Sequence, residues 1–356
     1  MERNSYNIAV VGATGNTGME TLQIIAERNF PINSIFAVAS EKSSGKGISF
    51  RDKTLKTQKL SDVDFSKVDI AFFCAGSGVS RKNANAVVDA GCVIIDKTSC
   101  FRLESKVPLI IPEVNIDALK NGAPLGIIST PNCIAVPLAM TLKVLNKLAP
   151  LKRIVVSTYQ SVSGAGRKAI AELYNQSKSI VSTGAIQSEV FARQIAFNVI
   201  PAIGNLYESG VSEEEDKISC EICKILKTDV KVALTCVRVP VFISHAMAVA
   251  CEFTKPFQEE GVCAALENCK GIVVVNRKDG SNVFTTPLDA QGEDAVYVSR
   301  IRRDTTVENG LLYWVVTDNL RKGAALNSVQ IAEAMISIDP QLKKFKKYEK
   351  AKAPTS

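Results

Sequence analysis

Two residues of this 356-residue chain have side chains suited to nucleophilic and acid–base chemistry, Cys133 and His245. Cys133 lies in STPNC (129–133), just before an amphipathic helix that the pattern predicts from Pro137 to Leu148. A thiol near a helix N-terminus has its thiolate favoured by the helix dipole and by free N–H groups. Most of the nine other cysteines lie in apolar surroundings, which predicts small buried hydrophobes. Position alone leaves Cys133 open as a nucleophile or as a packing residue.

His245 is the only histidine, so imidazole catalysis within one subunit depends on it. One long strand is predicted from Val230 to Ser244 and on towards Phe253. It contains the segment RVPVFISH (238–245), which has Arg238 at one end and the imidazole at the other. Because Pro240 interrupts the segment, an edge strand with an exposed charge is the alternative. A lone histidine is also often structural.

A glycine loop, GATGNTG (12–18), follows a predicted strand at Ile8–Val11 and precedes a predicted helix from Met19 to Arg28. Glycines let the backbone approach a phosphate, and the helix N-terminus supplies N–H groups to bind it. The alternative is a tight turn without a ligand. At the end of the second strand, Lys42 and Lys46 favour the 2′-phosphate of NADP, whereas Glu41 favours NAD.

The strands predicted in the first third are nearly continuously apolar and alternate with helices, which indicates a parallel sheet covered on both faces. They are Ile8–Val11, Ile35–Val38, Asp69–Phe73 and Cys92–Ile95.

After residue 132, longer strands predict an α+β domain with a mixed or antiparallel sheet. These strands include Arg153–Gln160, Ile272–Val275 and Leu311–Val316, and a final helix from Asn327 to Ile336 is expected to pack on the first domain. We therefore predict an α/β protein with a Rossmann-type dinucleotide-binding domain (1–132 plus 327–356) and an α+β catalytic and dimerisation domain (133–326).

The net charge of +7 comes from scattered residues, except for the terminal KKFKKYEKAK, which predicts a solvated helix end rather than a nucleic-acid arm. No apolar run has the roughly 18 residues of a membrane span, and no signal peptide is apparent, so we expect a cytoplasmic protein that binds neither nucleic acid nor membrane. Cys220 and Cys223 have CxxC spacing but no second ligand pair. We expect two ordinary residues of a helix from Glu213 to Leu226 and no metal site.

Six blocks along the chain, in this order and over nearly its whole length, resemble the aspartate-semialdehyde dehydrogenase family of the bacterial type. They are GATGNTG (12–18), FRLESKVPLIIPEVN (101–115), PNC (131–133), STYQSVSGAGRKAI (157–170), TCVRVPVFISH (235–245) and WVVTDNLRKGAALNSVQIAE (314–333). The resemblance implies reduction of aspartyl phosphate to aspartate semialdehyde with NADPH, in the biosynthesis of lysine, threonine, methionine and diaminopimelate. It also implies a homodimer or homotetramer.

The resemblance assigns roles by motif. Cys133 is similar to the nucleophile and His245 to the acid/base, while Gln160, Arg238 and Glu214 resemble substrate-binding residues, and Arg102 and Lys217 resemble phosphate-binding residues. Residues similar to those that contact the cofactor are Gly12, Thr14, Gly15, Asn16, Thr17, Gly18, Ser40, Lys42, Ser43, Ser163, Gly164 and Asn319.

The chain departs from the family pattern at two places. Ile134 and Ala135 follow PNC where the family has small hydroxyl residues, and Ala246 follows the histidine where it often has a serine. The acidic run 213–216 leaves the assignment of Glu214 open by one or two positions.

Two other functions fit parts of the sequence. One is a related thiol-dependent reductase that acts on N-acetylglutamyl phosphate or a CoA thioester. The Arg102 block and the Glu214–Lys217 segment argue against it, because they favour a free amino acid as the substrate. The other is a catalytically inactive dinucleotide-binding regulator, which would lack Cys133, His245 or an arginine.

Overall fold

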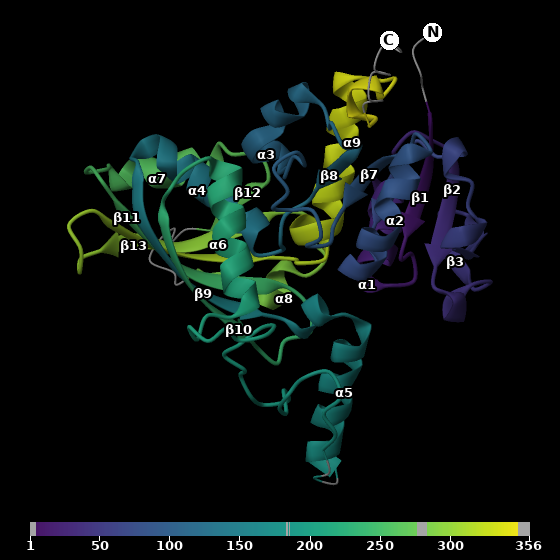
Figure 1. Ribbon diagram of the computed structural model, residues 1–356. Helices are drawn as coiled ribbons and strands as arrows, with labels where there is room; N and C mark the ends of the chain where they lie inside the picture. Colours follow the sequence, from purple (N-terminus) through teal and green to yellow (C-terminus); the bar gives the residue numbers. More distant parts are fainter. Residues whose placement is uncertain (1–4, 183, 185, 276–282, 348–356) are drawn as a thin grey trace. The chain divides into compact units, whose positions relative to one another are not determined.

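The computed structural model describes residues 5–182, 184, 186–275 and 283–347 (Figure 1). The chain forms two compact units, the first made of residues up to Pro131 and from Ala324 onward, and the second of Asn132–Gly323. The basic terminal run begins in a short 3-10 turn at Lys343–Phe345, and its last five residues, 348–352, lie outside the described part. Among the described helices, none combines the length and the hydrophobicity that a bilayer crossing demands.

The first unit has a six-stranded sheet in the order β5-β2-β1-β6-β7-β8, and each neighbouring pair is parallel. Its two faces belong to separate apolar clusters, with Ile8 and Val10 in one and Ala9 and Val11 in the other. The parallel sheet covered on both faces is therefore confirmed. The strands are β1 (Tyr6–Val11), β2 (Ile32–Ala39), β5 (Gln58–Lys59), β6 (Ile70–Phe73), β7 (Val93–Asp96) and β8 (Ile127–Ser129).

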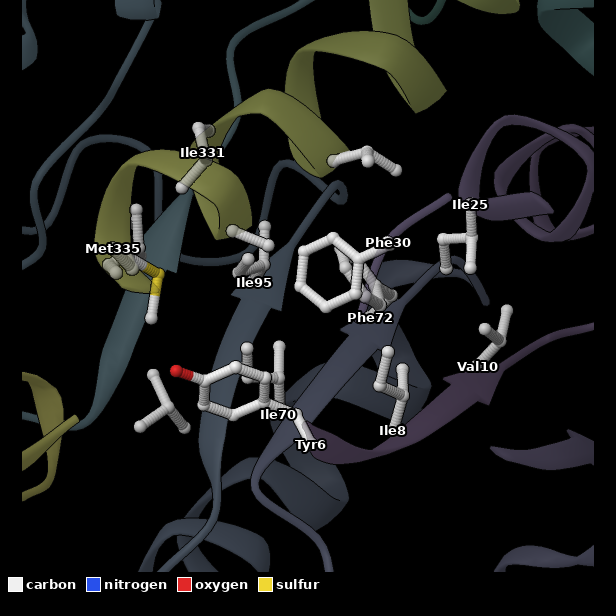
Figure 2. Packing of buried hydrophobic residues seen from close by; sticks show 14 of the residues in the cluster. Tyr6, Ile8, Val10, Ile25, Phe30, Ile70, Phe72, Ile95, Ile331 and Met335 are labelled. Carbon is white, nitrogen blue, oxygen red and sulfur yellow. The ribbon is translucent and has the colours of Figure 1, made fainter. Parts of the chain in front are cut away.

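Helices cover this sheet through regularly spaced apolar side chains. α1 (Asn16–Glu27) and the C-terminal α9 (Leu326–Ile338) contribute to one cluster, and α2 (Ser77–Asp89) contributes to the other. Figure 2 shows Ile331 and Met335 of α9 in the same cluster as Phe72 and Ile95 of the sheet. The last helix thus returns to the first unit, far from it in sequence. α3 (Pro112–Asn115) and the hairpin of β3 (Gly47–Phe50) and β4 (Lys53–Lys56) complete this unit.

The second unit has a mixed six-stranded sheet in the order β10-β9-β11-β14-β13-β12. β10 and β9 are parallel, as are β12 and β13, while the other pairs are antiparallel. The strands are β9 (Leu151–Gln160), β10 (Lys231–Arg238), β11 (His245–Phe253), β12 (Ile272–Val275), β13 (Val296–Asp304) and β14 (Gly310–Thr317). The helices of this unit are α4 (Ala135–Leu148), α5 (Arg167–Ser182), α6 (Glu213–Leu226), α7 (Glu259–Glu267) and α8 (Pro287–Ala290).

The prediction of one strand from Val230 towards Phe253 is wrong, because the chain leaves the sheet after Arg238 and re-enters at His245. Pro240 has no N–H for a strand ladder, and Ser244 has a positive φ of 72°. The intervening residues cross the end of β9, where the N–H groups of Val162 and Ser163 donate to the carbonyls of Val241 and Phe242. Arg238 and His245 thus lie on different strands.

Two helix starts also differ from the prediction. α1 begins at Asn16, inside the glycine motif, and α4 begins at Ala135 rather than at Pro137. The first turn of α1 contains the small or polar residues Asn16, Thr17 and Gly18, whereas α4 gains Ala135 and Val136 before Pro137. Apolar periodicity places a helix boundary only to within about one or two residues.

Candidate active site

Three strand ends meet at one edge of the sheet in the second unit. Gln160 ends β9, and Arg238 ends the parallel neighbour β10 directly opposite it. β11 runs antiparallel on the other side of β9, so it begins with His245 at the same edge. All three side chains are buried. Sheet topology therefore brings together a carboxamide, a guanidinium and an imidazole that lie far apart in sequence.

The Cys133 turn is fixed by Asn132 and two carboxylates of α6. The Asn132 N–H donates to Glu221 Oε2 at 2.6 Å, and its Nδ2 donates to Glu214 Oε1 at 2.8 Å. Its Oδ1 accepts from the N–H of Ile134, the residue that caps α4. Cys133 therefore lies immediately before the helix start, closer than the sequence predicted.

Glu214 connects this turn to the strand ends. The same oxygen that accepts from Asn132 also accepts from Gln160 Nε2 at 3.2 Å. The neighbouring carboxylates have other partners, since Glu213 pairs with Lys217 and Glu215 forms the capping box of α6. Of these three glutamates, Glu214 is the one hydrogen-bonded to Gln160, which supports the register chosen from the motif.

Arg238 lies within electrostatic range of the thiol. Burial lowers the pKa of its guanidinium, and the negative charges of Cys133 and Glu214 act in the opposite direction. Its Nη1 donates to the carbonyl of Ser161 at 2.6 Å. The Ser161 carbonyl thus holds one nitrogen of the guanidinium in place.

His245 is fully buried, and burial, followed by the Arg238 charge, lowers its pKa from 6.5 to about 3. Its Nδ1 accepts the Ser161 N–H at 3.0 Å, while Nε2 is buried without a hydrogen-bond partner. A Cβ added to Gly164 would lie 3.3 Å from Nε2 and 3.2 Å from Arg238 Nη1. Gly164 therefore keeps open the space that a reacting group needs next to the imidazole.

A second glycine borders the thiol. Gly323 lies in the π-helical turn Arg321–Ala325, and a Cβ there would lie 3.1 Å from Cys133 Cβ. π-turns often occur at functional sites because they displace the backbone locally. The residues at the two departures from the family pattern, Ile134 and Ala246, are buried.

The other thiols lack this setting. Burial raises the pKa of Cys236 and of Cys251 to about 12, and raises that of Cys92 as well. Cys220 and Cys223 lie inside α6, as predicted, and Cys223 Sγ contacts the carbonyl of Val230. Within the described residues, no cluster of three or more His, Cys, Asp or Glu side chains could hold a metal ion.

The two candidate phosphate-binding residues lie in different units. Arg102, in the first unit, is buried and donates to the carbonyls of Thr130 and Lys97 at 3.0 and 2.8 Å. Lys217, on α6 of the second unit, forms its ion pair with Glu213 one turn earlier.

The glycine loop of the first unit has the shape of a phosphate cradle. Gly12 has a φ of 89°, and a Cβ on Gly18 would lie only 2.1 Å from the Gly12 carbonyl oxygen. Thr14, Gly15 and Thr17 complete the turn at the start of α1. Asn16 Nδ2 is buried with no hydrogen-bond partner, as expected for a donor that faces a ligand. These residues fit the phosphates of a dinucleotide.

The candidate ribose-binding turn follows β2. Ser40 precedes a 3-10 turn that contains Lys42 and Ser43. Glu41, which argued for NAD in the sequence, pairs with Lys59 at 2.7 Å. Its charge is therefore partly compensated within the protein.

Ser163 and Asn319, expected to contact the cofactor, are buried and hydrogen-bonded to each other in the second unit. Sequence reasoning did not single out Ser161, Asn132 or Glu221. Glu221 lies two helical turns from Glu214 on the same face of α6, a spacing that could have revealed it.

The two structural units correspond to two different protein families. Residues 7–122 match the family described as "Semialdehyde dehydrogenase, NAD binding domain", and residues 142–322 match "Semialdehyde dehydrogenase, dimerisation domain". The fold and site thus define a two-domain semialdehyde dehydrogenase.

Similarity to individual proteins narrows the class. The chain is 51% identical to the aspartate-semialdehyde dehydrogenase of Rickettsia bellii and 41% identical to that of Aquifex aeolicus, with 93% of this chain and 98% of each relative covered. A crystal structure of aspartate semialdehyde dehydrogenase II from Vibrio cholerae, complexed with ASA, has a TM-score of 0.91 at 41% identity and covers 94% of this chain and 98% of that one. The chain belongs to the aspartate-semialdehyde dehydrogenase family of oxidoreductases.

Proposed function

We propose that this chain catalyses the reversible, NADP-dependent conversion of L-aspartyl 4-phosphate to L-aspartate 4-semialdehyde and phosphate through a thioester on Cys133. The observation that carries the proposal is a pair of hydrogen bonds to Glu214, one from Asn132 in the Cys133 turn and one from Gln160. Gln160 lies at the same end of the sheet as Arg238 and His245. This arrangement surrounds one thiol with groups for a carboxylate, an amine and a proton.

Substrate binding follows from charge and geometry. The buried Arg238 guanidinium binds the substrate α-carboxylate, because its planar fork matches the two oxygens. The Glu214 carboxylate binds the amino group, and Gln160 Nε2 orients the acyl group. Arg102 and Lys217 supply positive charge for the phosphate.

In the reductive direction the Cys133 thiolate attacks the acyl carbon, and the bond from that carbon to the phosphate oxygen breaks, leaving a thioester. Bound NADPH would supply the hydride that reduces this carbon. His245 takes the thiol proton at the start and gives a proton to the thiohemiacetal oxygen later. His245 then takes the hydroxyl proton back as the C–S bond breaks, which releases the aldehyde and restores the thiolate beside an imidazolium.

The test is an assay in the reverse direction. Purified protein receives aspartate semialdehyde, phosphate and NADP, and NADPH absorbance is followed. We expect turnover that requires phosphate and is abolished by Cys133→Ala. Matched reactions contain N-acetylglutamate semialdehyde, or coenzyme A in place of phosphate. A higher rate in either of these, or none in the first, contradicts the proposed substrate.

The choice of NADP is supported by the turn after β2. Lys42 and the hydroxyls of Ser40 and Ser43 suit a 2′-phosphate, and the Glu41–Lys59 pair offsets the one carboxylate that would repel it. Replacing NADP by NAD in the same assay tests this choice. Equal kcat/KM for the two cofactors contradicts it.

Homodimer formation is supported by exposed apolar side chains on α5 and the segment after it, in the unit that matches the dimerisation domain. They are Tyr174, Val181, Ile186, Val190, Phe197, Val199, Leu206, Tyr207 and Val211. Exposed apolar patches of this kind mark interaction sites. Sedimentation analysis is expected to give a dimer or tetramer and a smaller particle for Phe197→Glu. A monomeric parent protein contradicts it.

A cytoplasmic location is part of the proposal. All ten cysteines are thiols rather than disulfides, which suits a reducing compartment. There the reaction serves the biosynthesis of lysine, threonine, methionine and diaminopimelate. Fractionation of the source cells tests the location.

A further inference from the structure

A closed cluster of polar groups lies behind the His245 ring, on the side away from Nε2. Ser161 approaches Nδ1 with two atoms, its backbone N at 3.0 Å and its Oγ at 3.1 Å. Ser161 Oγ in turn lies 3.2 Å from Asn319 Oδ1 and 2.9 Å from Ser163 Oγ. His245, Ser161, Ser163 and Asn319 are all at most 2% exposed. Water therefore does not replace these contacts.

The Ser161 N–H determines the resting form of the imidazole. A backbone N–H can only donate, so Nδ1 must present a lone pair to it, and the proton of the neutral ring is then on Nε2. In that form Nε2 cannot accept a proton from a thiol. The ring must first hold its proton on Nδ1, and that proton then needs an acceptor.

Asn319 makes Ser161 Oγ that acceptor. Asn319 Oδ1 accepts the backbone N–H of Ser244 at 2.9 Å, and because that group can only donate, the orientation of the amide is fixed with its oxygen towards the serines. Once Nδ1 carries a proton, Ser161 can direct its hydroxyl hydrogen only to an acceptor other than Nδ1, and Asn319 Oδ1 at 3.2 Å is one. A lone pair on Ser161 Oγ is then free to accept from an Nδ1–H.

We propose that Ser161 is a positioning residue for acid–base catalysis. Its N–H stabilises the neutral form of His245, and its Oγ stabilises the imidazolium. Asn319 fixes the orientation of the Ser161 hydroxyl. The step starts from the neutral tautomer that holds its proton on Nδ1, where the Nδ1–H donates to Ser161 Oγ and Nε2 has a lone pair. The S–H bond of Cys133 then breaks as an Nε2–H bond forms. The products are a thiolate and an imidazolium, so charge and protons balance. Delivery of the Nε2 proton to the thiohemiacetal oxygen then returns the ring to its neutral form.

The same serine connects the imidazole to the substrate-binding arginine. The Ser161 carbonyl accepts Arg238 Nη1 at 2.6 Å, while its N–H and Oγ face His245. Arg238 is the charged group that disfavours the imidazolium, and its charge also interacts with Cys133 and Glu214. Ser161 Oγ offsets the repulsion from Arg238 without adding a charge.

The inference rests on the proposed roles of Cys133 and His245, and its test uses no substrate, so it can fail separately from the proposed function. The full-length protein is treated with iodoacetamide across a pH series, and Cys133 alkylation is measured by peptide mass spectrometry. Ser161→Ala keeps the N–H and the carbonyl but loses Oγ. We expect the midpoint of Cys133 thiolate formation to rise by about one pH unit, the range of a hydrogen bond to a charged group.

Two further variants separate positioning from packing. Asn319→Asp places a negative charge behind the same hydroxyl and is expected to lower the midpoint by about one unit. Ser157→Ala, on the same strand but outside this cluster, is expected to leave the midpoint unchanged. A Ser161→Ala protein with the parent midpoint, whatever its melting temperature or rate, overturns the inference. Opposite shifts from Ser161→Ala and Asn319→Asp support it.

Discussion

In the first unit the glycine cradle comes from one unbroken segment, Gly12–Gly18, whereas in the second unit Gln160, Arg238 and His245 come from three different strands. A parallel sheet followed by a helix places a local loop at the carboxyl ends of its strands, so the loop sequence nearly suffices. A mixed sheet can bring a strand start beside two strand ends, which no local pattern encodes. Damage to the cradle should therefore stay local, whereas damage at the strand edge should affect several functions together.

The largest expected effect is at the thiol of the second unit. Cys133→Ser is expected to lower kcat by about 10⁴-fold or more, because a serine hydroxyl is far less ionised at neutral pH and the site is built around one nucleophile. Steady-state kinetics measure it. Cys220→Ser, an exposed thiol on α6, is the matched control and should retain the parent rate.

The first unit should be most sensitive at Gly18. In Gly18→Ala the new Cβ would lie 2.1 Å from the Gly12 carbonyl, so the loop must shift. We expect NADP affinity to fall by about 10–100-fold, which corresponds to the 1–3 kcal/mol of an overpacked site. Isothermal titration measures it.

The control for Gly18 is Gly78→Ala on α2, where an added Cβ meets nothing within 4 Å. It should leave affinity unchanged and stabilise the unit by up to about 1 kcal/mol. If Gly18→Ala instead changed the alkylation profile of Cys133 and not the cofactor affinity, the contrast between a local and an assembled site would be wrong.

At the strand edge, Arg238→Lys is expected to raise the KM for aspartate semialdehyde by about 10–30-fold, because an ammonium cannot reproduce the bidentate fork. The guanidinium also lies over the Phe191 ring at 5.9 Å, a contact the lysine would lose. Initial-rate kinetics provide the measurement. Arg153→Lys, an exposed position on β9, should behave as the parent.

The two units should also lose stability over different pH ranges. The pKa of His245 is lowered from 6.5 to about 3, so its contribution is fully present above pH 6.5 and is lost as pH falls towards 3. At pH 5.5 the loss is about 1 kcal/mol by this linkage. Burial lowers the pKa of Lys97, in the first unit, from 10.5 to about 8. Its contribution to stability is therefore present above pH 10.5 and is lost as the pH falls towards 8.

Urea unfolding across pH measures both effects. His245→Asn should remove the pH dependence between 6.5 and 5 that is assigned to the imidazole, while Lys97→Met should remove the one above pH 8. An unchanged profile for either variant would show that the group titrates elsewhere.

The smallest expected effect concerns the exposed Glu41–Lys59 pair. Lys59→Ala leaves the Glu41 carboxylate uncompensated near the candidate 2′-phosphate site, and the preference for NADP over NAD should fall by about 2–5-fold, the scale of one surface ion pair. The ratio of kcat/KM values measures it. Lys67→Ala, which breaks the exposed pair with Asp64, should not alter the ratio.

Much of the first unit was predictable from sequence because its strands are buried on both faces and therefore read as apolar runs. The boundaries were less predictable. α1 and α4 begin two or three residues before the predicted positions, because Asn16 and Ala135 carry no apolar periodicity. In the second unit the predicted long strand hid the excursion of residues 239–244 across the end of β9, since a Pro and a positive φ at one serine are weak local signals.

The sequence by itself determined which residues could do the chemistry, because one imidazole, one thiol before a helix and one glycine loop are recognisable by type and spacing. Only the tertiary structure decided which side chains act together. Glu214 rather than Glu213 faces Gln160, and Ser161 stands between His245 and Arg238. The physical reason is that strand order and helix rotation fix these contacts between residues far apart in the chain, and hydrogen-bond direction then assigns the protons.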